Sequence, residues 1–430
     1  MSFFTELSPA WQAIFGFLVV ITIGALLLML PVSTVSEGGM SFTNAFFTST
    51  SAVCVTGLIV VDTGTVFTFF GQLVIISLIQ IGGIGIILAS SFLIIGFKKS
   101  LSMENRFELQ ENFANWNFDK VKQALKRVFI LLFLVEAGGA AILTYSFSKT
   151  MPFFNALWHG VFHSISATCN AGFSLNADSL VGYQDNALVV LSVAGLIVIG
   201  GLGFIVLAEL ISGTGEQARY TLHTRVMLWG TAILITGGTL SFAFLHPESS
   251  WLDYIFQSIT TRTAGFNSID LRLWSTPAML IMMVLMFIGA GPSSTAGGIK
   301  ITTVAILLSN LWARIRHHRN THLLGRKLNW KQVHHALILF FIALFIVMFF
   351  VFALTITEDS ALEVIMFEVF SALGTVGLSL GITPELTTAG RWLIIFAMYL
   401  GRLGPLTIAL VLIKPARQEY TYPEERMLIG

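Results

Sequence analysis

The stretch Ser51-Ala52-Val53-Cys54-Val55-Thr56-Gly57-Leu58 points to the fold, because the chain repeats its pattern three more times. The later copies are SATCNAGF at 166–173, TTRTAGF at 260–266 and SALGTVGL at 371–378. Each copy is a run of small or polar residues, then one glycine, then Leu or Phe. A pattern that recurs at long intervals indicates one structural unit used four times.

A second group of glycines follows each copy at a nearly constant distance. Its first members lie 25, 28, 24 and 24 residues after the glycine of the preceding copy, at Gly82, Gly200, Gly289 and Gly401. Glycine is common in membrane helices, where it allows close packing. For this second group, a packing role and a functional role both remain open.

Composition places the chain in a membrane. Hydrophobic residues make up 55% of it and charged residues 11%, whereas a soluble domain has about 25% charged residues. A spanning helix needs about 20 apolar residues. Eight runs meet this requirement, in four pairs that each enclose one copy of the motif: 11–30 and 69–97, 128–147 and 187–211, 226–245 and 277–308, 336–356 and 392–413.

Basic residues predict the orientation. Of the 24 Lys and Arg residues, 19 lie between the pairs or in the C-terminal tail, four lie inside the pairs, and Arg402 lies in a spanning run. The positive-inside rule therefore puts both termini in the cytoplasm and makes the short motif segments enter from outside. Ordinary extracellular loops are the alternative, but such loops are rarely this apolar. The acidic residues after the motifs are Asp62, Asp178, Asp270 and Glu385. They would lie near the outer mouth and concentrate cations there; ordinary exposed loop residues are the alternative.

The motif suits a pore for a bare cation. A cation gives up its water only where oxygens replace it, and backbone carbonyls do this without a full charge. Carbonyls aimed at one axis require backbone conformations that glycine adopts at low cost. We predict a fourfold potassium filter, with sodium as a possible second ion, made of Val55, Thr56, Gly57, Asn170, Ala171, Gly172, Thr263, Ala264, Gly265, Thr375, Val376 and Gly377.

The helix after the third copy contains a segment that opposes regular helix, because proline and several glycines fall in mid-span. We predict a gating loop there; a static kink is the alternative. Its residues are Gly289, Ala290, Gly291, Pro292, Ser293, Ser294, Thr295, Ala296, Gly297 and Gly298. Arg402, at the equivalent place in the fourth repeat, would face the same cavity, or would pair with Glu136 or Glu368. Cys54 and Cys169 are expected to pack as small apolar side chains and not to form a disulfide.

The motif segments, the stretch 289–298 and the sequence YLGRLGP at 399–405 resemble the Ktr branch of the Trk/Ktr/HKT superfamily of cation transporters, over essentially the whole chain. The resemblance implies an all-α membrane fold of four repeats, each a spanning helix, a pore helix and a second spanning helix, at 1–100, 101–213, 214–318 and 319–430. It also implies potassium uptake, often sodium-dependent as in a symporter. Finally, it implies a homodimer in the cell membrane with a cytosolic regulatory ring that binds ATP, ADP or NAD.

Other classes of protein fit less well. An enzyme would need a nucleophile–base set or metal ligands, and neither H-E-x-x-H nor G-x-S-x-G occurs. Nucleic-acid binding would need a basic face on a soluble domain. A receptor or scaffold would leave the fourfold glycine pattern unexplained. A sodium-selective or weakly selective transporter of the same superfamily remains the nearest rival.

Overall fold

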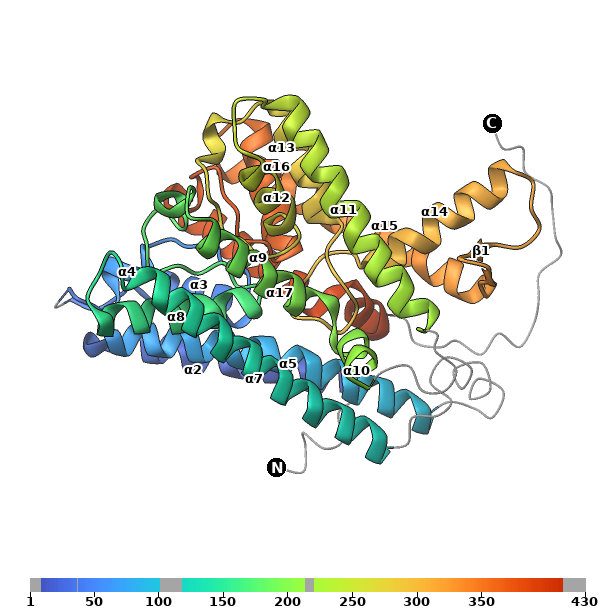
Figure 1. Ribbon diagram of the computed structural model, residues 1–430, viewed down its shortest axis with the longest axis horizontal. Helices are drawn as coiled ribbons and strands as arrows, with labels where there is room; N and C mark the ends of the chain where they lie inside the picture. The colour runs from blue at the N-terminus through green and yellow to red at the C-terminus, as the bar shows by residue number, and fades with distance from the viewer. Residues whose placement is uncertain (1–8, 37, 101–117, 213–219, 413–430) are drawn as a thin grey trace.

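The structure, a computed structural model, describes residues 9–36, 38–100, 118–212 and 220–412. Its helices follow the same order four times: a long helix, a short helix and a second long element (Figure 1). The short helices are α3 (Phe42–Val53), α8 (Phe153–Thr168), α12 (Trp251–Thr260) and α16 (Leu362–Gly374), and each ends just before a motif glycine. The first long helices are α2 (Pro9–Leu28), α7 (Phe118–Phe147), α11 (Leu222–Leu245) and α15 (Trp330–Thr357). The second long elements are α5 (Phe69–Ser100), α9 (Ala187–Leu202) with α10 (Phe204–Ser212), α13 (Thr276–Phe287) with α14 (Ile301–Ile315), and α17 (Thr388–Leu412).

The starts of two of the four short helices are capped by side chains. Ser41 caps α3 by accepting from the Asn44 amide, at 3.4 Å. Ser250 caps α12 in a reciprocal arrangement with Asp253, which satisfies two amides that would otherwise lack partners. These caps matter because a helix of this length is marginal without tertiary support.

Packing between the repeats closes into a ring. The second long element of each repeat contacts the short helix of the next one, in the pairs α5 with α8, α9 with α12, α13 with α16, and α17 with α3. The last pair joins the end of the chain to its beginning. The four short helices are therefore surrounded by long ones, and the motif glycines that follow them are brought to the middle of the molecule.

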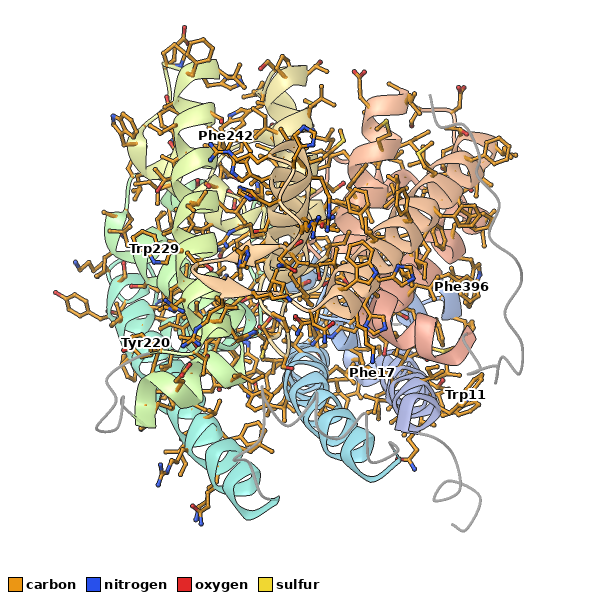
Figure 2. All side chains as sticks on the ribbon, turned by 90° about the vertical axis from the view of Figure 1, so that its right-hand side faces the viewer. Trp11, Phe17, Tyr220, Trp229, Phe242 and Phe396 are labelled. Carbon is orange, nitrogen blue, oxygen red and sulfur yellow. The ribbon has the colours of Figure 1, made fainter. Side chains whose placement is uncertain are left out.

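The outer surface is apolar. Trp229 and Phe396 point outward, whereas Phe242 lies inside and is fully buried (Figure 2). Within the described residues, three helices are long and apolar enough to span a membrane by themselves, in α7, α11 and α15. The elements α9 and α10 meet the same test as one bent pair. An outer surface with so many exposed apolar side chains is typical of a membrane protein, in which lipid and not water surrounds the helices.

Three of the eight predicted spans are not continuous helices. The run 187–211 bends by 99° between α9 and α10, at Gly203, where φ is 90°. The run 277–308 is non-helical from 288 to 300, as its proline and glycines predicted. The run 392–413 is kinked at Gly404, with φ of 78°, and its last residue lies outside the described residues.

One feature departs from an all-α fold. A two-stranded hairpin of β1 (His322–Leu323) and β2 (Arg326–Lys327) turns through Leu324 and Gly325, both with positive φ. It lies between α14 and α15, far from the short helices (Figure 1). The sequence showed only a basic segment between two apolar runs here and did not predict the hairpin.

Candidate functional site

The four motif glycines form a closed ring. A Cβ built on Gly57 would lie 3.1 Å from the Gly172 Cα, and one built on Gly172 would lie 2.9 Å from the Gly265 Cα. A Cβ on Gly265 would be 3.2 Å from the Gly377 Cα, and one on Gly377 would be 2.9 Å from the Gly57 Cα. Each of these atoms would also meet a carbonyl oxygen of the neighbouring segment. Only glycine allows four backbones to approach this closely.

Backbone conformation alternates in all four segments, which we call the filter segments: 55–57, 170–172, 263–265 and 375–377. The four glycines have φ between 69° and 95°. The residue two positions earlier also has positive φ, at 55° for Val55, 59° for Asn170, 71° for Thr263 and 48° for Thr375. The residue between them does not. Alternation of this kind turns successive carbonyls of a strand-like segment toward the same side. The sequence predicted it at the glycines but not at the earlier positions.

Buried hydroxyl groups hold the filter segments to the short helices. The Gly57 amide donates to Ser51 Oγ at 3.1 Å, and the Gly377 amide donates to Ser371 Oγ at 3.0 Å. In the other two repeats the hydroxyl donates to the carbonyl after the glycine, from Ser166 to Phe173 at 2.8 Å and from Thr260 to Phe266 at 2.6 Å. These are the residues that begin the four motif copies, and sequence reasoning gave them no role.

Several oxygens in the filter segments lack protein partners. The hydroxyl oxygens of Thr56, Thr263 and Thr375 are buried without a hydrogen bond to any described residue. Buried polar groups are nearly always satisfied, so each such group calls for an explanation. Ordered water or a cation that passes through the ring would supply the missing partner.

The stretch 289–298, which we call the intramembrane loop, touches all four repeats. Gly291 donates to the Gly201 carbonyl at 3.0 Å, and the Phe204 amide donates to the Ser293 carbonyl at 3.1 Å. A Cβ on Gly297 would clash with Thr375 in the fourth filter segment. The loop therefore lies against the filter and is held by backbone hydrogen bonds that do not depend on a helix.

Two basic side chains bind the loop. Arg402 donates from Nη1 to the Thr295 carbonyl and from Nη2 to the Gly82 carbonyl, the latter at 2.8 Å. Lys300 Nζ donates to the carbonyls of Ala296 and Gly297 at 2.6 and 3.1 Å. Arg402 is buried, with 4% of its surface exposed. The alternative that Arg402 pairs with Glu136 or Glu368 is wrong. The guanidinium donates to backbone carbonyl oxygens, and no carboxylate is among its partners.

The second glycine group has a packing role in three repeats. A Cβ on Gly82, Gly200 or Gly401 would clash with the carbonyl of Val53, Thr168 or Leu373, at the end of the short helix of the same repeat. In the third repeat Gly289 instead faces Gly297 of the loop. The equivalent glycine thus packs against a short helix in the first, second and fourth repeats and against the intramembrane loop in the third.

The predicted acidic mouth is partly occupied by local contacts. Asp62 caps α4 (Thr63–Val66), and its Oδ1 accepts from the Thr65 amide at 2.7 Å. The guanidinium of Arg272, 2.7 Å away, holds the pKa of the Asp270 carboxyl below its usual value. Asp178 and Glu385 are exposed. Two of the four carboxylates are therefore free of such contacts.

Sequence reasoning did not predict a further buried basic side chain. Arg262, near the end of α12, is buried with 4% of its surface exposed, although its position in a motif copy suggested the outer side. Cys54 and Cys169 are buried free thiols, as predicted.

Together, the helical membrane fold of four repeats and the central ring of closely packed glycine backbones define an all-α integral membrane protein. The sequence matches the family described as cation transport protein, TrkH, over residues 12–225 and 223–421, so the chain belongs to that family. It is 38% identical to the Ktr system potassium uptake protein B of Vibrio alginolyticus, over 96% of this chain and 93% of the relative. Identity is 39% to the protein of the same name from Bacillus subtilis, over 98% and 97% of the two chains. Identity is 37% to the potassium/sodium uptake protein NtpJ of Enterococcus hirae, over 99% of this chain and 98% of the relative.

A solved structure supports the fold. The potassium transporter TrkH from Vibrio parahaemolyticus superimposes with a TM-score of 0.76, over 95% of this chain and 86% of that one. Sequence identity to it is 20%. The predicted all-α membrane fold is confirmed.

Proposed function

We propose that this chain carries potassium into the cell through the four filter segments. The ring of glycines with alternating backbone conformation supports this function most directly, because it presents carbonyl oxygens from four sides. The full-length similarity to two potassium uptake proteins supports the choice of ion. The membrane potential would drive uptake, at about 2.3 kcal/mol per charge for each 100 mV.

Ion flux in liposomes tests this proposal. Purified protein is reconstituted, and influx is measured separately for potassium, rubidium and sodium under the same imposed potential. We expect potassium and rubidium to enter and sodium to lag well behind. Equal influx of all three ions, or none above empty liposomes, would contradict a potassium filter.

The main alternative is a transporter that accepts sodium as well. The name of the Enterococcus hirae relative includes both potassium and sodium, and this relative is nearly as similar to the chain as the other two. The filter segments are also short, with three residues each, so fewer ion sites are available than in a longer filter. Sodium influx comparable to potassium influx in the same liposomes would favour this alternative.

We propose that the intramembrane loop is the gate. Its small side chains would let it withdraw from the pore without large repacking. Few of its backbone hydrogen bonds belong to a helix, and Arg402 and Lys300 hold it by carbonyl contacts that can break one at a time.

We propose that the regulatory partner docks on two cytoplasmic segments with seven Lys and Arg residues each. They are 298–335, which contains the hairpin, and 98–127, much of which lies outside the described residues. Arg314 lies 5.6 Å from the ring of Trp330, and Arg316 lies 4.6 Å from the ring of Trp312. Both tryptophans are more than half exposed. Neutral substitutions at Arg314, Arg316 and Arg319 should reduce co-purification of the nucleotide-binding regulatory ring, whereas Lys149→Gln, at the opposite end of the molecule, should not. Undiminished co-purification at moderate salt would move the docking site elsewhere.

The chain is further proposed to form a homodimer in the cell membrane with both termini in the cytoplasm and a separate pore in each copy. Because Cys54 and Cys169 are buried, an introduced surface cysteine can be labelled selectively. Lys327→Cys should react with an impermeant thiol reagent only in inside-out vesicles, and Asp178→Cys only in right-side-out vesicles. Reaction of both from one side would refute the orientation. The mass of the detergent-purified protein tests the dimer.

A further inference from the structure

A cavity of about 370 Å³ opens beside the filter, between the first and second repeats. Its walls come from α5, α7, the end of α8 and the intramembrane loop, and Figure 1 shows α5, α7 and α8 close to one another. The apolar part of the wall is Phe129, Leu132 and Phe133. The polar part is Gln80, Glu136, Thr168, Cys169 and Thr295. A single water takes about 30 Å³ of liquid volume, so this cavity has room for an ion with some of its hydration shell.

Glu136 is the unusual member of this wall. It lies halfway along the apolar span Leu125–Phe147, and 8% of its surface is exposed. Gln80 Nε2 donates to its two carboxylate oxygens at 3.2 and 3.3 Å. Among the described residues the one salt bridge joins Asp270 and Arg272, so no basic side chain neutralises Glu136 there. A carboxyl group at this depth is costly and needs a partner.

The other polar groups around the cavity present oxygens. Gln80 turns its Oε1 toward Cys169, whose thiol lies 3.5 Å away. The Thr295 hydroxyl lies 3.5 Å from the Thr168 carbonyl and 3.2 Å from the Gly200 carbonyl. Thr168 is the last residue of α8, so the negative end of that helix lies at the cavity. Arg402 donates to the backbone carbonyl of Thr295 and is not among the residues that line the cavity.

We propose that this cavity is a second cation site, away from the filter ring, which holds one alkali ion on the Glu136 carboxylate with oxygens of Gln80, Thr168 and Thr295. Carboxylate, amide, hydroxyl and carbonyl oxygens are ligands of hard cations. The ion would replace the missing basic partner of Glu136. Because Thr295 belongs to the intramembrane loop, occupancy of this site would hold the loop next to α5 and α7.

Equilibrium binding to the purified protein in detergent tests the site, with radioactive sodium and radioactive rubidium used in separate titrations. We expect Glu136→Gln to lose one bound ion per chain relative to wild type, and the ion lost identifies the occupant as sodium or as a potassium analogue. Glu368→Gln is the matched control, because Glu368 is also a buried carboxyl, accepts a hydrogen bond from Thr383 and lies outside the cavity. It should retain the wild-type stoichiometry.

Three further variants separate this site from the filter and from misfolding. Gly57→Ser alters the filter and should keep the ion that depends on Glu136, so the second site can stand even if the proposed filter fails. Gln80→Met and Thr295→Val keep side-chain volume and each remove an oxygen. Each should weaken binding of that ion by about tenfold, the smallest loss typical when even an outer-shell partner of a metal ligand is removed. Equal binding of both ions by wild type and Glu136→Gln, or unchanged affinity in both volume-matched variants, overturns the proposal in favour of a protonated carboxyl.

Discussion

Substitution of Gly57 by serine probes the filter ring most directly. Gly57 has φ of 95°, and an added Cβ would lie 3.1 Å from the Gly172 Cα and closer still to the Ala171 carbonyl oxygen. A side-chain-bearing residue in such a conformation costs about 1–3 kcal/mol. The clash can be relieved only by movement of backbone, because the atoms it meets belong to the neighbouring filter segment. The Ala171 carbonyl would therefore leave its place in the ring.

If the strain is expressed as weaker ion binding, it corresponds to a loss of potassium affinity of about 5- to 150-fold. We expect the apparent affinity for potassium to fall by this amount and discrimination against sodium to weaken. Uptake kinetics for both ions in a host that lacks its own potassium uptake would measure this, together with the liposome influx series. Gly195→Ser is the control, because a Cβ at Gly195 meets nothing within 4 Å. Unchanged kinetics for Gly57→Ser would remove Gly57 from the filter.

Deletion within 291–297 should raise potassium influx in liposomes and loosen its dependence on the regulatory partner, and influx at or below wild type from a correctly inserted variant would show that the loop is no gate. Arg402→Ala should act in the same direction but more weakly, because Lys300 still binds the loop. Ser51→Ala should lower the midpoint of thermal unfolding, since the buried Gly57 amide loses its acceptor at a cost of about 1–3 kcal/mol. Ser77→Ala, whose exposed hydroxyl bonds only within its own helix, should leave that midpoint unchanged.

The repeats could be predicted from the sequence because two glycine patterns and eight apolar runs mark them independently. Whether each spanning helix is continuous could not be predicted. Hydropathy is unbroken through Gly203 and Gly404, and a glycine in a membrane helix is compatible with either a straight or a bent path. In the third repeat a proline stands among four glycines and several small polar residues, so there the interruption was predicted correctly. The fourth repeat also has a proline, Pro405, directly after Gly404, but no break was predicted from it.

Sequence reasoning singled out the four glycines that the structure brings into one ring, but it missed the positive φ of Val55, Asn170, Thr263 and Thr375. A β-branched residue disfavours that conformation, so local preference argued against it at three of the four positions. The packing of the four segments into a closed ring imposes the positive φ at these positions. The partners of Arg402 were missed for a related reason: carbonyl oxygens occur at every residue, and only the folded arrangement selects those of Thr295 and Gly82.

The ring of four filter segments comes from a single chain, in which each quadrant has its own codons. In a pore of four identical subunits, one substitution changes every quadrant together. Here the central residues of the four segments are Thr56, Ala171, Ala264 and Val376, so three different residue types already occupy equivalent positions. In the proposed filter, selection can therefore adjust the preference for an ion one quadrant at a time, while the other three sides of the coordination shell stay unchanged.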